Sequence, residues 1–431
     1  MRQASLRSVS SLLGGMGVLL AGSGLLGTTL GLRATLEGFG ELLIGVVMSG
    51  FFLGYVVGAR VCPPVIRRVG HVRAFAACAA MTAAVALLYG LSVDPLVWWG
   101  LRVLNGIGLL GIYMVIESWL NASAGQARAR VFSIYMMINL FAVAAGQYLI
   151  VLHGAAGLAS FALAAVFFCI GLLPIALTPA EQPGHIETRA LSLRSVYAVS
   201  PVGFAGALGT GLAMGSYWSF AAVYGHATGL DDAGVANFIA AAVIGGAVLQ
   251  WPIGWLSDRR DRRTVLAGAS VLSLASLVVM WFAAPGGQLP AVLCGLAFGG
   301  TGFSIYSLAV AQTHDRFGPS DSLEATKALL LLHGLGAMAG PPLAGAVMKG
   351  LGIQAFPAVL AAMFAVLAAF TVYRIRVDAP VPEIDRGSFL PVSRTSAVAM
   401  DLDPRSDAAI AVEPEDMHLN PNERRAEVQG R

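Results

Sequence analysis

The stretch "GWLSDRRDRRTVL", residues 254–266, places two aspartates and four arginines between two long apolar runs. Residues 234–256, which lead into it, and residues 264–284, which follow it, carry no charged side chain. A run of about 20 apolar residues is long enough to cross the hydrocarbon core of a bilayer as a helix. The stretch therefore indicates a short charged connection between two membrane-spanning helices.

The same alternation of apolar runs and charged connections extends through most of the chain. Of its 431 residues, 57% are hydrophobic and only 12% are charged, which is too little charge for the surface of a soluble protein of this size. A soluble helical bundle would also show polar stripes along its helices, and these runs show few. We therefore predict an all-α integral membrane protein with twelve transmembrane helices, at residues 9–31, 41–60, 73–92, 96–119, 131–152, 157–178, 199–224, 234–256, 264–284, 289–312, 324–348 and 353–373.

The arginines indicate which side of the membrane each connection faces. They cluster after the second, fourth and eighth runs, whereas the connections on the other side offer little beyond Arg33 and Lys349. Positively charged short loops favour the cytoplasmic side. We predict a multi-pass protein of a bacterial cytoplasmic (inner) membrane, with an even number of spans and both termini in the cytoplasm.

Composition further divides the chain into two halves. Residues 179–197 are polar and contain two prolines, so we interpret them as a cytoplasmic linker between six-helix bundles at residues 1–178 and 198–375. Residues 376–431 are rich in Pro, Asp, Glu, Ser and Arg, and we expect them to form a disordered cytoplasmic tail.

Short matches at similar offsets suggest that the halves are repeats. A constant shift places Asn139 on His333 and Gly146 on Gly340, and a slightly larger one places Gly54 on Gly254. Parallel repeats of this kind bind substrate between the halves near the bilayer midplane, and transport proceeds by rocking one half against the other.

Two motifs carry a resemblance to a known family. "GWLSDRRDRRTVL" resembles the cytoplasmic loop signature of the major facilitator superfamily: a Gly, three residues, an Asp and a basic cluster. "LRVLNGIG", residues 101–108, resembles a second signature on the fourth helix of that family. The "ESWLN" stretch that begins at Glu117 is similar to one in a poorly characterised bacterial branch.

This resemblance implies a monomeric secondary transporter that moves a small molecule by alternating access, often with protons. We favour efflux over uptake by a permease. Two positions depart from the family pattern, because Gly58 stands where an Asp is usual and Gln147 stands where antiporter subgroups have Pro. The expected partners are a small-molecule substrate, protons and membrane lipid, with no nucleic acid.

Other classes of protein lack support in the sequence. A membrane enzyme would need intramembrane clusters of His, Asp or Glu, and we find none, so we predict no catalytic residues, metal site or cofactor. A phosphate-binding loop of the GxxxxGK[ST] type is missing, which argues against an ATP-driven pump. A sensor on a transporter fold, the remaining alternative, would need an output domain.

The charged loop has a mechanical interpretation. A carboxylate at a helix end can accept charge-assisted hydrogen bonds from arginine, and such contacts can hold one conformation closed and break in another. We predict a conformational latch made by the residues Gly254, Asp258, Arg259, Arg262 and Arg263.

Polar side chains inside the apolar runs predict a cavity. Arg102, Asn105, Tyr113 and Glu117 share one face of the fourth predicted helix, which should point into the protein because polar groups facing lipid would be unsatisfied. We add Asn139, Gln147 and His333 as cavity or coupling residues, since Asn139 and His333 hold equivalent repeat positions.

Glu117 leaves three interpretations open. It could pair structurally with Arg128 or Arg130, which follow in the next loop. It could instead carry protons, because burial raises the pKa of a carboxylate. A third interpretation is that it binds a cationic substrate.

Overall fold

The computed structural model describes residues 2–124, 128–177, 191–317, 319–382, 386–387, 389 and 395–396. The regular elements in this part of the chain are all helical. They are α1 (Arg2–Leu36), α2 (Glu41–Val69), α3 (His71–Leu91), α4 (Pro95–Ala124), α5 (Arg128–Tyr148), η2 (Leu149–Leu152), α6 (Ala159–Ala176), α7 (Leu193–Val199), α8 (Pro201–Ala227), α9 (Asp232–Arg259), α10 (Arg262–Ala283), η3 (Ala284–Gly286), α11 (Gln288–Gly302), α12 (Ile305–His314), α13 (Pro319–Leu351), η4 (Ile353–Ala355) and α14 (Phe356–Val377).

The predicted membrane helices correspond to the observed ones, which confirms the all-α membrane fold. Eleven helical segments of the described chain are long and apolar enough to span a bilayer. The twelfth, α8, has 27 residues but is less apolar, and most of its side chains are buried within the protein. A helix surrounded by other helices does not need a lipid-compatible surface, which explains its weaker hydropathy.

Two features of the helices differ from the prediction. The tenth predicted run is broken into α11 and α12 at Phe303 and Ser304, after a glycine-rich stretch. The short helix α7 lies at the end of the segment that we interpreted as a linker; residues 179–190 of that segment lie outside the described residues.

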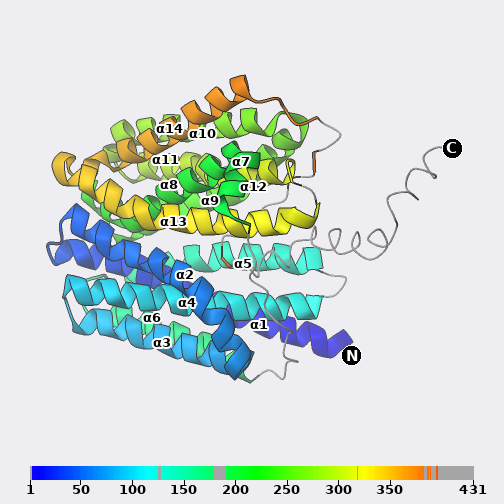
Figure 1. Ribbon diagram of the computed structural model, residues 1–431. Helices are drawn as coiled ribbons and strands as arrows, with labels where there is room; N and C mark the ends of the chain where they lie inside the picture. Colours follow the sequence, from blue (N-terminus) through cyan, green and yellow to red (C-terminus); the bar gives the residue numbers. More distant parts are fainter. Residues whose placement is uncertain are drawn as a thin grey trace.

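The helices form two groups that lie side by side (Figure 1). Helices α1–α6 make one group and α8–α14 the other, and α2 packs along α13 where they meet. Helix α1 begins and α14 ends at the same end of the bundle, as an even number of crossings requires. We call this the Asp258 end, because α9 reaches it near Asp258, and the other the Glu41 end, where α2 begins.

The two groups make close contact at the Glu41 end. A Cβ atom at Gly45 of α2 would clash with the backbone carbonyl of Pro341 on α13, and one at Gly345 would clash with the carbonyl of Glu41. Nearby, the Tyr148 hydroxyl donates to Asn237 Oδ1 at 2.7 Å and so links α5 to α9. Glycine lets the helix backbones approach this closely, so the groups are tightly joined at this end.

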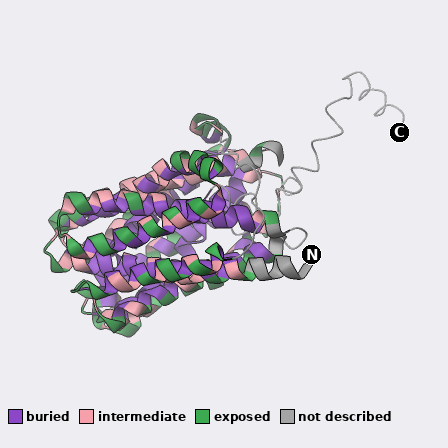
Figure 2. Ribbon diagram, turned by 90° about the horizontal axis from the view of Figure 1, so that it is seen from below, coloured by how far each residue is buried: buried purple, intermediate pink, exposed green. Residues whose placement is uncertain are grey.

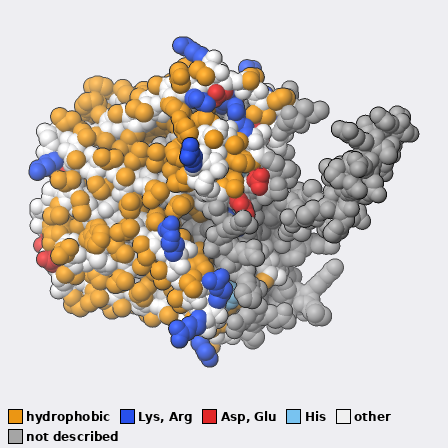
Figure 3. Space-filling model, in the orientation of Figure 1, with side chains coloured by type: hydrophobic (Ala, Val, Ile, Leu, Met, Phe, Trp, Pro, Cys, Tyr) orange, Lys and Arg blue, Asp and Glu red, His pale blue; other side chains and the backbone are white. Residues whose placement is uncertain are grey.

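The outer surface suits a lipid environment. Buried residues face the interior of the bundle, while large apolar side chains such as Trp251, Phe282 and Val366 are exposed on its outside (Figure 2). Figure 3 shows one face covered mostly by hydrophobic side chains, with Lys and Arg gathered mainly toward the Asp258 end. An exposed apolar surface of this extent is stable in a bilayer and not in water.

Candidate functional site

A cavity of about 400 Å³ lies between the two groups of helices. Its size is within the range of ligand pockets for small organic molecules. Helices from both groups line it: Phe51 and Tyr55 come from α2, Arg102 from α4, and Trp218 from α8. It is therefore placed where a solute could contact both halves at once.

Three of the residues predicted on one face of α4 line this cavity: Arg102, Asn105 and Tyr113. Each is buried in the protein. Their spacing of three and eight residues places them along one side of the helix, which is the side that faces the opposite group.

Glu117 lies beyond the lining residues, nearer the Asp258 end, and is fully buried. Tyr135 on α5 donates a hydrogen bond to its Oε1, and Thr395 and Ser396 donate to its carboxylate from the C-terminal segment. Of the arginines that we considered as partners, Arg130 is exposed, and the side chain of Arg128 lies outside the described residues.

Asn139, Gln147 and His333 also line the cavity. Asn139 Nδ2 donates to the Tyr113 hydroxyl at 3.3 Å, and Gln147 Oε1 accepts a hydrogen bond from Thr28 on α1. His333 Nδ1 lies 3.4 Å from the Thr210 hydroxyl. The two equivalent repeat positions, Asn139 and His333, thus reach one cavity from the two groups of helices.

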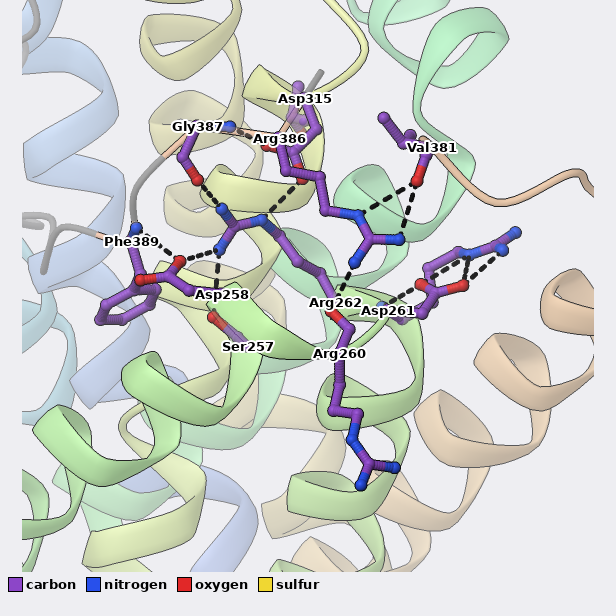
Figure 4. Close-up of polar contacts among 12 residues, drawn as sticks. Ser257, Asp258, Arg260, Asp261, Arg262, Asp315, Val381, Arg386, Gly387 and Phe389 are labelled. Atoms are coloured by element: carbon purple, nitrogen blue, oxygen red, sulfur yellow. Dashed lines mark hydrogen bonds and ion pairs between the residues drawn. The ribbon is translucent and has the colours of Figure 1, made fainter. Parts of the chain in front are cut away.

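The charged loop forms a buried cluster around Arg262 (Figure 4). Arg262 Nε donates to Asp315 Oδ2 at 2.6 Å, and its Nη1 lies 3.2 Å from Asp258 Oδ1 and 3.0 Å from Ser257 Oγ. The side chains of Arg262 and Asp315 are only 1% and 2% exposed. Asp315 was not predicted from sequence, although it is the most buried acid of the cluster.

The other predicted latch residues are arranged differently from the prediction. Arg263 pairs with Asp261, at 2.6 Å between Nη2 and Oδ2, and not with Asp258. Arg259 is one residue from Asp258 on α9, about 100° around the helix, and its guanidinium lies 3.7 Å above the Trp255 ring. Of the arginines, only Arg262 therefore makes the contact with Asp258 that we predicted.

Asp261 caps the N-terminus of α10. Its Oδ1 accepts a hydrogen bond from the backbone N–H of Arg263 at 2.9 Å, in addition to the ion pair. Burial alone would raise the pKa of Asp261, but the Arg263 hydrogen bonds and charge lower it below its usual value. The carboxylate is thus kept ionised at the helix N-terminus, where negative charge is favourable.

Described residues of the C-terminal segment contact these two sites. The backbone N–H of Gly387 donates to Asp315 Oδ1 at 3.1 Å, and that of Phe389 donates to Asp258 Oδ1 at 2.8 Å (Figure 4). The Phe389 ring lies against Gly254, where a Cβ atom would clash with it. Thr395 and Ser396 line the cavity. Our prediction for residues 376–431 did not include these contacts, and most of those residues lie outside the described part.

Comparison with known families agrees with these features. A family model described as Major Facilitator Superfamily matches residues 12–320 and 203–399. Curated relatives carry the name "Uncharacterized MFS-type transporter YcaD". The protein from Escherichia fergusonii is 26% identical over 347 residues, or 80% of this chain and 89% of its own. The protein from Escherichia coli (strain S88) is 27% identical over the same coverage.

Solved structures share the fold at low sequence identity. The nucleoside transporter NupG has a TM-score of 0.75 at 15% identity, over 86% of this chain and 99% of its own. A bacterial homolog of the human lysosomal transporter Spinster, inward-facing and occupied, has a TM-score of 0.70 at 13% identity, over 88% and 98%. The Escherichia coli fucose:proton symporter FucP has a TM-score of 0.51 at 16% identity, over 84% and 97%.

Proposed function

Because this chain belongs to the major facilitator superfamily and is a secondary transporter, we propose that it exports a small organic molecule across a bacterial cytoplasmic membrane in exchange for protons. The observation that carries this proposal is the cavity of about 400 Å³ between two groups of helices, lined by residues of both. A solute held there is exposed to one side of the membrane or the other according to which end is open.

The ends of the bundle differ in a way that supports alternating access. Backbone contacts between α2 and α13 join the two groups at the Glu41 end, whereas the charged cluster around Arg262 lies at the Asp258 end. The arginine-rich connections gather at the Asp258 end, so we assign that end to the cytoplasm. We infer that the cavity is closed at the Glu41 end in this conformation, and that the chain acts as a monomer.

We assign proton coupling to Glu117. It is a buried carboxylate between the cavity and the cytoplasmic end, bonded to hydroxyl groups of Tyr135, Thr395 and Ser396. Hydroxyl groups can accept from a neutral carboxylic acid as well as donate to a carboxylate, so this environment tolerates both protonation states. A group that is stable in both states can take up a proton on one side and release it on the other.

Inside-out and right-side-out membrane vesicles together test proton coupling and the direction of transport. The full chain is produced in bacterial membranes, and respiration acidifies the lumen of inside-out vesicles. We expect labelled small organic ions to accumulate in the inside-out vesicles, and a protonophore to abolish the accumulation. Accumulation only in right-side-out vesicles would show uptake in place of export. Accumulation that is unaffected by the protonophore would exclude proton coupling.

A further inference from the structure

Arg102 is a buried cation without an acidic partner in the described structure. The residue is 8% exposed and lines the cavity wall. Its Nη2 lies 3.2 Å from the Met48 sulfur, and its guanidinium carbon lies 4.9 Å from the centre of the Phe51 ring. Its Nε has no hydrogen-bond partner, and another polar neighbour of the guanidinium is the neutral hydroxyl of Tyr89.

These contacts do not compensate for the hydration free energy that the charged guanidinium loses when it is buried. A thioether sulfur is a weak acceptor, and an aromatic ring offers only partial compensation for a buried charge. An unpaired buried charge is strongly unfavourable unless an opposite charge or good acceptors meet it. Arg102 is therefore poised to accept a negatively charged group that enters the cavity.

The rest of the lining favours an anion with an apolar body. Lys327 adds a second cationic side chain, and the described lining residues include no Asp or Glu. Glu117 lies about 22 Å from Arg102 along α4, too far for the two to pair. The aromatic rings of Phe51, Phe52 and Trp218 line the same cavity and can pack against apolar groups.

We propose that the cavity binds a small amphiphilic organic monocarboxylate, whose two oxygens accept hydrogen bonds from Arg102 while its apolar part packs against Phe51 and Trp218. This inference rests on the proposed function, because it takes the cavity to be the transport site. Arginine suits this role since its planar donors match the geometry of a carboxylate.

Binding to the purified full chain in detergent tests the charge preference without requiring transport. The probes are 3-phenylpropionate, 3-phenylpropanol and 3-phenylpropylammonium, with matched series of shorter and longer alkyl chains. Because a charge-assisted hydrogen bond contributes about 1.5–3 kcal/mol, we expect the carboxylate to bind about tenfold more tightly than the alcohol or more. The ammonium compound should bind most weakly. Absence of an anion preference in every series would overturn the inference, whatever the vesicle assay shows.

Variants of Arg102 test whether this residue causes the preference for the carboxylate probe. Arg102→Gln should lose most of the difference between the carboxylate and the alcohol, because Lys327 remains in the lining, and Arg102→Lys should keep a larger part of it. Arg33→Gln is the matched control, because Arg33 pairs with Glu37 outside the cavity. An undiminished preference for the carboxylate in folded Arg102→Gln protein would contradict the role of Arg102. If that variant does not fold, the headgroup series on the native chain still decides the substrate class.

A separate observation concerns the C-terminal segment. Gly387 and Phe389 are held by the acids of the charged cluster, and Arg262 donates to the Gly387 carbonyl. Arg386 donates to the carbonyl of Val381 at 2.8 Å and to that of Arg260 at 3.2 Å (Figure 4). These contacts attach the segment to the α9–α10 connection through both side-chain and backbone groups.

Farther along the chain, the same segment reaches the cavity. Ser396 is fully buried, and the Tyr135 hydroxyl oxygen lies 2.9 Å from Thr395 Oγ1. Both residues line the cavity and both bond to Glu117. The geometry points to an autoinhibitory plug formed by Thr395 and Ser396, which occupy the Asp258 end of the cavity beside Glu117 and withdraw before solute can pass.

Cysteine labelling measures this access without a known substrate. The full chain carries Asn139→Cys as a reporter in the cavity and Cys169→Ser to remove the exposed native cysteine. A water-soluble maleimide is applied to purified protein. Adding Phe389→Ala, which removes the ring packed against Gly254, should speed labelling of the reporter severalfold.

Val377→Ala, at an exposed side chain near the end of α14, is the control and should leave the labelling rate unchanged. A second variant, Ser396→Asp, places a negative charge beside Glu117 and should also speed labelling. Equal labelling rates in the reference protein and both variants would exclude the plug.

Discussion

Replacing Arg262 by glutamine is expected to cause the largest loss of stability of any single change in the charged cluster. The variant leaves the Asp315 carboxylate, whose side chain is 2% exposed, without its counter-charge. Removing one partner of a buried ion pair costs roughly 3–5 kcal/mol, because the remaining charge is neither paired nor hydrated. The effect is measured as thermal unfolding of the detergent-purified protein, with size-exclusion chromatography used to quantify the folded fraction after heating.

The pH dependence of that loss identifies its cause. Burial raises the pKa of Asp315, and the Arg262 charge opposes the increase. Without Arg262, the folded-state pKa rises further above its unfolded value, so the destabilisation is greatest where Asp315 must ionise and is relieved where it is protonated. The difference in stability between the native chain and Arg262→Gln should therefore narrow as the pH falls from about 8 to about 5.

Two further variants act as controls. Arg259→Gln changes an exposed arginine that lies over Trp255, so a loss of about 0.5–1 kcal/mol is expected. The double variant Arg262→Gln with Asp315→Asn removes both charges and should recover much of the lost stability. An Arg262→Gln protein as stable as the native chain would show that the charged cluster does not stabilise the folded state.

Asp258→Asn separates the mechanical role of the cluster from its structural one. The Asp258 side chain is 38% exposed, so its ion pair with Arg262 contributes little to stability. We expect this variant to fold normally and to transport more slowly, because the ion pair across the α9–α10 connection is lost, while the amide oxygen can still accept the hydrogen bond from the Phe389 backbone N–H.

The helices could be predicted from sequence because the membrane imposes a simple rule of length and hydropathy. An apolar run as long as residues 234–256 is expected to form a membrane-spanning helix. The face that each residue occupies on a helix could also be predicted from its spacing. The cavity is lined by Arg102, Asn105 and Tyr113, which we had placed on one face. The break after Gly302 was less apparent, since glycine is common in both the interior and the ends of membrane helices.

Contacts between distant segments could not be predicted from one sequence. Asp315 is 53 residues from Arg262, and the packing of α10 against α12 brings them together. Ser396 is 279 residues from Glu117 and belongs to a segment whose composition resembles that of a solvated tail. Local patterns identify which side chains are polar within an apolar run, whereas the partner of each depends on the tertiary structure.

Replacing Glu117 by glutamine should have the largest effect on transport. The amide has nearly the shape of the carboxyl group but cannot bind and release a proton. We therefore expect gradient-driven accumulation in inside-out vesicles to fall to the level seen with a protonophore. Exchange of labelled for unlabelled solute, which needs no net proton movement, should continue in reconstituted liposomes.

Each of the three roles considered for Glu117 gives a different result in these assays. Loss of accumulation with intact exchange supports proton coupling. Loss of folded protein supports a structural role, because Glu117 is fully buried and bonded to Tyr135. Loss of binding for the ammonium probes alone supports a cation site. Tyr135→Phe is the matched control, since it removes one hydrogen bond and keeps the carboxylate, so accumulation should persist in that variant. Accumulation that also persists in Glu117→Gln would place the proton site elsewhere in the cavity, where His333 is another side chain that can bind a proton.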